Sequence, residues 1–203
     1  MSNPFAILSL IISIPFFGML FTLVAKESDE TKGKNCSNVA VFTIIANMVL
    51  IWRIFMLIDE KKLKLQLFEK FDWLSIPDIN LVFAVDNISL MMILAVHLVT
   101  LMGIVFTRSM LERQKSLMVF TLLFLSFSTG FFVSADIFSF FIFFEAMLIP
   151  LFMLIGMYGE FKRSERLSGF FLYNFIGSLI LFVSILMIYK YYGSLTLNKT
   201  DKI

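Results

Sequence analysis

A lone carboxylate interrupts one of the most apolar stretches of this 203-residue chain. Glu145 is the only charged residue in 137–157, IFSFFIFFEAMLIPLFMLIGM. If this stretch is a helix that crosses a bilayer, Glu145 lies near the midplane, where burying an ionised carboxylate costs on the order of 2 to 3 kcal/mol or more. Such a group can be protonated or ionised depending on a nearby cation, which suits a proton relay. The alternative is a neutral carboxyl group that only packs against a neighbouring helix.

A proline follows the glutamate within the same stretch. Pro150 has no N–H to donate to the carbonyl of Ala146. That carbonyl lies beside Glu145 and can accept a hydrogen bond from water or from a partner side chain. The pair therefore supports a polar site in the middle of a span.

Three other ionisable residues lie in or at the ends of apolar stretches. His97 is the only histidine, and its imidazole is either a second relay group or a neutral packing residue bonded to a backbone carbonyl. Arg53 either extends its long side chain to the membrane interface or joins a charge network. Lys190 lies among Tyr189, Tyr191 and Tyr192, which is typical of a belt at the membrane interface.

Small polar residues and the cysteine count limit the remaining chemistry. Ser126, Ser128 and Thr129 precede Gly130 and favour close helix packing, with a water path as the alternative. The single Cys36 and the single histidine exclude a disulfide and a Cys/His metal site, so we expect no metal and no cofactor in this chain. A net charge of +2, dispersed along the chain, gives no reason to expect a nucleic-acid partner.

The elements that position these residues are transmembrane helices. Hydrophobic residues make up 59% of the chain and the mean hydropathy is +0.90. A bilayer core about 30 Å thick requires ~20 apolar residues of helix. The runs are continuously apolar and do not alternate, which excludes a membrane barrel. The sequence therefore predicts an all-α, polytopic bundle in a single transmembrane domain, 1–203, with spans at 4–25, 39–58, 88–107, 116–134, 137–157 and 167–189.

The connections between these spans are short, with one exception. Only Ala135 and Asp136 separate the fourth and fifth spans, so we expect a tight hairpin with Asp136 at the incoming helix N-terminus. The long connection 59–86 begins charged and becomes apolar around Trp73 and Pro77, which predicts an amphipathic segment along the membrane surface. With the N-terminus on the outer side, the inner loops hold nine Lys and Arg residues and the outer side holds seven. Because basic residues concentrate on the inner side of a membrane, this difference favours an N-terminus on the outer side.

The span that contains Glu145 also carries a recognisable pattern. The run 136–159, DIFSFFIFFEAMLIPLFMLIGMYG, resembles the signature of NADH dehydrogenase subunit 4, in which an aspartate and a Phe-rich stretch lead to Glu-x-Met-Leu-Ile-Pro. The related subunits 2 and 5 also carry a glutamate at this point, but the Met-Leu-Ile-Pro sequence that follows favours subunit 4. The resemblance extends over GFFLYNFIGSLILF and back to FAVDNISLMMI, where Asn87 replaces the usual glycine. It covers about residues 71 to 195.

This resemblance implies an antiporter-like subunit of the membrane arm of respiratory complex I, the proton-translocating NADH:ubiquinone reductase. Glu145 matches the essential fifth-span glutamate of the family, which faces a lysine on the seventh span. NADH, FMN, iron–sulfur clusters and quinone are expected on other subunits. The family has about fourteen spans and this chain has six, so we expect either a split gene or a fragment. In the first case a separate chain supplies the remaining spans and the lysine, and packs against spans four to six.

Several alternatives remain open at this point. The chain could be a structural membrane-arm scaffold that does not conduct protons, or a subunit of an Mrp-type cation/proton antiporter or a membrane-bound hydrogenase, which share the fold and the glutamate. The expected partners are other membrane-arm subunits and membrane lipid. The 26 phenylalanines and 13 methionines indicate an AT-rich genome. We therefore expect the mitochondrial inner membrane, with a bacterial plasma membrane as the alternative.

Overall fold

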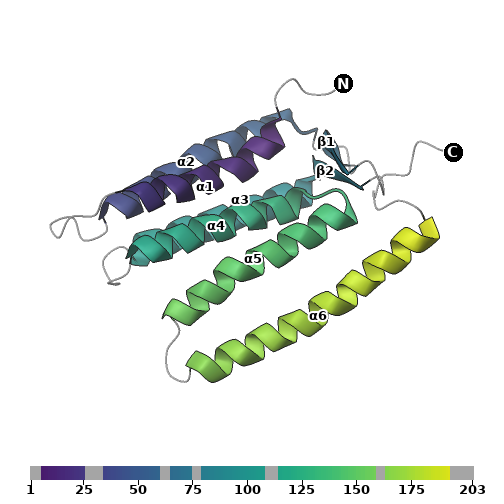
Figure 1. Cartoon of the computed structure of the whole chain (residues 1–203). Coiled ribbons are helices and arrows are strands. Elements are labelled where there is room, and N and C mark those ends of the chain that lie inside the picture. The colour runs from purple at the N-terminus through teal and green to yellow at the C-terminus, as the bar shows by residue number, and fades with distance from the viewer. Residues whose placement is uncertain are drawn as a thin grey trace.

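Six apolar helices run side by side through the computed structural model (Figure 1). The structure describes residues 6–25, 34–59, 65–74, 79–107, 114–158 and 163–192. All six helices are long and apolar enough to cross a membrane. The predicted helical bundle of six spans is therefore confirmed, and the helices are α1 (Ile7–Val24), α2 (Lys34–Leu57), α3 (Asn87–Thr107), α4 (Gln114–Val133), α5 (Ile137–Tyr158) and α6 (Arg163–Tyr192).

Two helices begin four or more residues before the predicted spans. Helix α2 begins five residues before residue 39, and α6 begins four residues before residue 167. In both cases polar residues continue the helix outside the apolar stretch, because backbone hydrogen bonding does not require an apolar side chain. The predicted spans thus describe the apolar part of each helix and not its full length.

Helix α4 is the centre of the bundle. It packs against α1, α2, α3 and α5, whereas α6 packs mainly against α5 at the edge. Figure 1 shows this order, with α6 at the opposite side of the bundle from α1 and α2. Two buried apolar clusters fill the space among α1, α2, α3 and α4, together with Phe83 and Val85 from the connection 59–86. Phe143 on α5 packs against one of them. The compact core therefore lies mainly among the first four helices.

The connection 59–86 contains a β-hairpin that the sequence did not predict. Strands β1 (Gln66–Leu74) and β2 (Ile79–Val85) pair antiparallel, so the described fold is all-α apart from this hairpin. In β2 the consecutive residues Val82, Phe83, Ala84 and Val85 are all buried. A strand buried on both faces has no alternating pattern, and a short apolar run of this kind cannot be assigned from periodicity. Pro77 and the side chain of Trp73 lie outside the described residues.

The hairpin supplies the cap for the first helix. Ala6 at the N-cap position makes no side-chain hydrogen bond to α1. Instead the buried carboxylate of Glu69 on β1 accepts hydrogen bonds from the backbone N–H groups of Leu8 and Ser9, at 2.7 and 3.0 Å, and from the Ser9 hydroxyl at 2.6 Å. A negative charge here satisfies free N–H donors and complements the helix dipole. Glu69 therefore acts as an N-cap from a distant segment.

The second strand holds the junction between α4 and α5. The N–H of Val82 donates to Asp136 Oδ2 at 2.8 Å, and the N–H of Ala135 donates to the Val82 carbonyl at 2.8 Å. Asp136 Oδ1 also accepts from the N–H of Ser139 at 2.7 Å, and the Ser139 hydroxyl donates to Oδ2. The prediction that Asp136 caps the incoming helix is thus confirmed. One hairpin binds near the N-termini of both α1 and α5.

Small residues let the helices approach closely. A Cβ atom at Gly130 on α4 would overlap the ring of Phe143 on α5, and one at Gly18 on α1 would overlap the side chain of Thr43 on α2. Ser126 donates to the carbonyl of Ile12 at 2.7 Å and joins α4 to α1. The packing interpretation of residues 126–130 is therefore confirmed at Ser126 and Gly130.

The Glu69 cap can be tested by its effect on stability. Glu69→Ala removes the acceptor of two backbone donors and should lower the free energy of unfolding by about 2 kcal/mol. Hydrogen exchange should show lost protection at the amides of Leu8 and Ser9. The neighbouring exposed Lys70 offers a control, since Lys70→Ala should change stability by less than about 0.5 kcal/mol. Equal effects of the two substitutions would contradict the cap.

The close contact at Gly130 predicts opposite outcomes for two glycine substitutions. Gly130→Ala should destabilise the protein by about 1 to 3 kcal/mol, because the added methyl group meets the Phe143 ring. Gly103→Ala on α3 meets no atom within 4 Å. It should leave stability unchanged or raise it by up to about 1 kcal/mol through helix propensity. Thermal unfolding of the detergent-solubilised chain measures both, and tolerance of Gly130→Ala would show that α4 and α5 can separate.

Candidate functional site

Glu145 lies in the middle of α5, with one carboxylate oxygen buried. Its side chain is half-buried overall, and Oε1 has no hydrogen-bond partner among the described residues. The residue lines a pocket of about 200 Å³ between α5 and α6. A buried polar atom without a partner is costly, so this oxygen is suited to binding a proton, a water molecule or a cation.

The pocket is built by one face of each helix. Glu145, Ile149 and Phe152 lie four and seven residues apart on α5 and so share a face. Phe171 and Asn174 on α6 close the other side. Pro150 is buried within α5, and the helix continues through it.

Asn174 is the second polar residue of this pocket. Its Nδ2 donates to the carbonyl of Phe170, one turn earlier on α6, at 2.8 Å. No Lys, Arg or His is among the described residues that line the pocket. The site is therefore a carboxylate and a carboxamide in apolar surroundings, and any cation must come from elsewhere. The sequence contains one signal for Asn174, because it is the single amide side chain in the apolar span 167–189.

His97 is in another part of the bundle and does not line the Glu145 pocket. It is fully buried on α3, where Nδ1 lies 2.8 Å from the Ile93 carbonyl and Nε2 lies 2.8 Å from Asn47 Nδ2 on α2. A carbonyl only accepts, so Nδ1 carries the proton. Nε2 then accepts from the amide of Asn47. The structure thus contains the backbone bond expected of a neutral packing histidine, and a relay role stays a prediction.

The histidine belongs to a network that compensates for a proline. Pro15 in α1 has no N–H, which leaves the Ile11 carbonyl without its helical donor. Asn47 Nδ2 donates to that carbonyl at 2.9 Å as well as to His97. Asn47 Oδ1 is buried without a partner in the described part of the chain. Asn47 therefore joins three helices near mid-membrane, and sequence inspection had not singled it out.

The remaining cationic candidates lie on the surface of the bundle. Arg53 is exposed on α2, one turn before the helix ends at Leu57, beside the exposed Trp52 and Met56. This position permits its side chain to reach the interface. Lys190 is exposed in the last turn of α6 next to Tyr191. Neither residue lines the Glu145 pocket, so the structure does not bring the three predicted site residues Glu145, His97 and Arg53 together.

The fold resembles that of membrane proteins in two solved complexes. The chain superimposes on respiratory complex I from Thermus thermophilus with a TM-score of 0.76 and 21% identity, over 92% of this chain and 36% of that one. It superimposes on the Mrp complex from Dietzia sp. with a TM-score of 0.77 and 16% identity, over 93% of this chain and 20% of that one. At these identities the likeness establishes the architecture alone.

Sequence comparison gives a narrower assignment. A family model described as NADH:quinone oxidoreductase/Mrp antiporter, TM matches residues 134–203, a range that includes Glu145. NADH-quinone oxidoreductase subunit M of Rickettsia bellii is 28% identical over 95% of this chain. NADH-ubiquinone oxidoreductase chain 4 of Marchantia polymorpha is 30% identical over 94%. The predicted resemblance to the subunit 4 family is therefore confirmed, and the chain spans about 40% of the length of these relatives.

The Asn47 network predicts both a tautomer and a stability change. Since the chain has one histidine, ¹⁵N NMR should show a single neutral imidazole with Nδ1 protonated and Nε2 unprotonated. Asn47→Leu leaves the Ile11 carbonyl and His97 Nε2 without a donor, and should cost about 2 kcal/mol of stability. Asn35→Leu, at an exposed position on the same helix, is the matched control. An imidazolium or an Nε2–H tautomer would overturn the network.

Proposed function

We propose that this chain is a proton-translocating membrane-arm subunit of NADH:quinone oxidoreductase, in which Glu145 is the proton-carrying group. The names of the sequence relatives support the complex, and the antiporter-like fold supports the transport role. On this proposal NADH, FMN, iron–sulfur clusters and quinone bind other subunits, and the chain itself performs no redox chemistry. The membrane is the mitochondrial inner membrane, or the plasma membrane if the chain is bacterial.

The observation that carries the proposal is the buried, unpartnered oxygen of Glu145. An isolated carboxylate in apolar surroundings is stabilised either by binding a proton or by the approach of a cation. Movement of a cation toward or away from the pocket would therefore release or reload the proton. Quinone reduction elsewhere in the complex would supply the energy for that movement. Asn174 would hold water beside the carboxyl group.

The exposed surface of α6 supports an assembly with further helices. Only Ser178 and Ile185 are buried among the described side chains of α6, whereas large apolar residues such as Phe171, Ile180 and Met187 are exposed. We propose that other membrane-arm helices cover this face. They would include a lysine-bearing span that approaches Glu145, as the family resemblance implies, whether on a separate chain or on a continuation of this one.

The Mrp-type antiporter is the second candidate. It is favoured by a structural similarity as close as that to complex I, and by a family model whose description names both. The sequence relatives named above support the quinone oxidoreductase. A scaffold without proton conduction has no specific observation in its favour, because scaffolding does not need an unpartnered carboxylate at mid-span.

Isolation of the native complex separates these candidates. Mild solubilisation of the source membrane, purification through this chain and mass spectrometry of its neighbours should identify NADH-oxidising and quinone-binding subunits. Co-purification with antiporter subunits alone would show that the chain is a subunit of an Mrp-type antiporter. Recovery of the chain with neither set would overturn the proposed function.

The role of Glu145 predicts a specific transport defect. Glu145→Gln should reduce proton translocation coupled to NADH oxidation by at least about tenfold, because an amide cannot release a proton. Glu145→Asp should restore part of the transport, since it keeps the titratable group. Asp59→Asn, which removes an exposed carboxyl group after α2, is the control and should leave transport unchanged. Normal proton pumping by an assembled Glu145→Gln complex would reduce Glu145 to a packing role.

A further inference from the structure

Two polar side chains line the small pocket between α5 and α6. Among the described residues around this pocket of about 200 Å³, only Glu145 and Asn174 have polar side chains. The others are leucine, isoleucine, methionine and phenylalanine residues. A molecule in the pocket that bonds a lining side chain therefore bonds the carboxylate or the carboxamide.

No direct hydrogen bond joins these two side chains. Oε1 of Glu145 is buried without a partner among the described residues, and Nδ2 of Asn174 donates to the Phe170 carbonyl at 2.8 Å. The pocket has room for water, since one molecule occupies about 30 Å³ of the liquid. Water between the carboxylate and the amide would satisfy the buried oxygen, which is costly to leave without a partner.

The bond to Phe170 sets the direction of the Asn174 amide. A carbonyl only accepts, so Nδ2 and not Oδ1 is the atom that meets it. Within α6 the same carbonyl is also the acceptor for the backbone N–H of residue 174, four positions later, and so does not need the side chain as a donor. The bond therefore orients the amide. Oδ1 and the second N–H of Nδ2 are left for other partners.

An amide can hold water beside a carboxyl group in both of its protonation states. When Glu145 is ionised, the water donates to the carboxylate and accepts from the amide N–H. When Glu145 is protonated, the water accepts from the carboxyl O–H and donates to Oδ1 of Asn174. An aliphatic side chain offers neither bond, and an ionised carboxylate only accepts. A carboxamide is thus matched to a neighbour that gains and loses a proton.

Aromatic contacts hold α6 against α5 on both sides of Asn174. Before it along α6, Phe171 meets Phe152 of α5 edge to face, with ring centroids 6.0 Å apart. After it, Phe182 meets Phe141 of α5 at 5.5 Å. The helix that carries the amide is therefore fixed beside the helix that carries the carboxylate.

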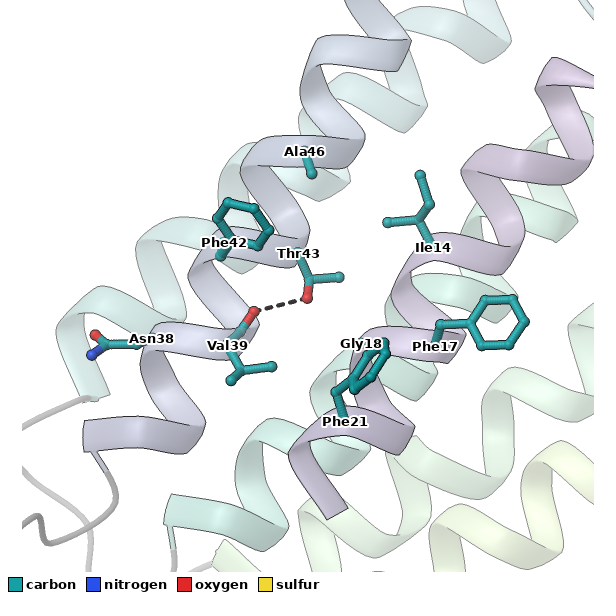
Figure 2. Close-up of a pocket in the computed structure, with 9 residues that line it drawn as sticks. All are labelled: Ile14, Phe17, Gly18, Phe21, Asn38, Val39, Phe42, Thr43 and Ala46. Atoms are coloured by element: carbon teal, nitrogen blue, oxygen red, sulfur yellow. Dashed lines mark hydrogen bonds between the residues drawn. The ribbon is translucent and has the colours of Figure 1, made fainter. Parts of the chain in front are cut away.

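The groove between α1 and α2 provides a contrast. It is larger, about 660 Å³, and none of the described residues that line it is charged. Figure 2 shows its Thr43 hydroxyl donating to the Val39 carbonyl of the same helix at 2.8 Å, among apolar side chains such as Phe17 and Phe42. The size of a hollow therefore does not by itself indicate proton exchange, which requires an ionisable group such as Glu145.

We propose that Asn174 is a positioning residue for proton exchange at Glu145, because its amide holds the water that takes and returns the proton. The carboxyl O–H bond of Glu145 breaks as a third O–H bond forms on this water, which leaves a carboxylate and a hydronium ion in the pocket. The reverse step returns the proton to Glu145. Asn174 has this role only if Glu145 carries protons, so the role rests on the proposed function.

Substitutions of Asn174 in the assembled complex test the amide. Asn174→Leu offers no hydrogen bond and should reduce proton translocation coupled to NADH oxidation several-fold, with Asn174→Val as a second apolar variant. Asn174→Gln keeps the amide and should keep most of the transport. Ser184→Ala is the matched control, because the exposed Ser184 also donates to a carbonyl of α6, at 2.8 Å, but does not line the pocket. Equal transport in the leucine and glutamine variants would overturn the role of the amide.

Radiolytic labelling detects the water itself. X-ray irradiation of the complex in H₂¹⁸O generates hydroxyl radicals from ordered water, and mass spectrometry locates the ¹⁸O that they add to nearby side chains. Labelling of Met153 and Phe171, which line the pocket, should fall several-fold in Asn174→Leu and persist in Asn174→Gln. Labelling of Phe42 in the α1–α2 groove should not change in any variant. Equal pocket labelling in the leucine variant and the unmodified complex would overturn the proposal.

The two readouts separate the role of Asn174 from that of Glu145. Reduced transport in Asn174→Leu with unchanged pocket labelling would show a structural effect and overturn the positioning role. Lost labelling with normal transport would overturn it as well, since that water would not take the proton. Normal transport in Glu145→Gln would overturn the proposed function itself, whereas a defect in Glu145→Gln beside normal transport in Asn174→Leu would overturn only the role of Asn174.

Discussion

The bundle depends on satisfying backbone groups that a bilayer leaves without partners. Lipid offers no hydrogen bonds, so each helix end and each carbonyl freed by proline needs a partner from the protein or from water at the interface. Glu69 and Asp136 meet this need near the N-termini of α1 and α5, and Asn47 meets it at the carbonyl freed by Pro15. Because β1 and β2 belong to one hairpin, the first and fifth helices are held at the same end of the molecule. The position of Glu145 along the bilayer follows from that attachment.

Glu145 differs from the other buried carboxylates, because its Oε1 has no hydrogen-bond partner among the described residues. Asp136 and Glu69 are also buried carboxylates, yet each accepts several hydrogen bonds from backbone and hydroxyl donors. Such bonds hold each carboxylate in one position. Glu145 has an apolar pocket with one carboxamide opposite. The same side-chain chemistry therefore serves structure at the hairpin, whereas at mid-span one carboxylate oxygen has no partner among the described residues.

The two sides of the bundle differ in how they meet their surroundings. The first four helices and strand β2 enclose a shared core, and an open apolar groove lies between α1 and α2. Apart from Phe143, which packs against that core, helices α5 and α6 lie outside it, and they expose apolar surface near the pocket that Glu145 lines. The bundle thus has an enclosed core on one side and an exposed apolar edge at α6 on the other.

The sequence by itself determined the number of spans, the type of fold, the capping role of Asp136, the mid-span place of Glu145 and the family resemblance. These features depend on local hydropathy and on short motifs, which can be read along the chain. Only the tertiary structure decided that Glu69 caps α1, that Asn47 bonds His97 and Ile11, and that Asn174 shares a pocket with Glu145 while His97 and Arg53 do not. The hairpin also emerged only there, because β2 is buried on both faces and has no alternation. Bonds between residues up to 114 positions apart arise from packing, and linear hydropathy contains no information about which helices pack together.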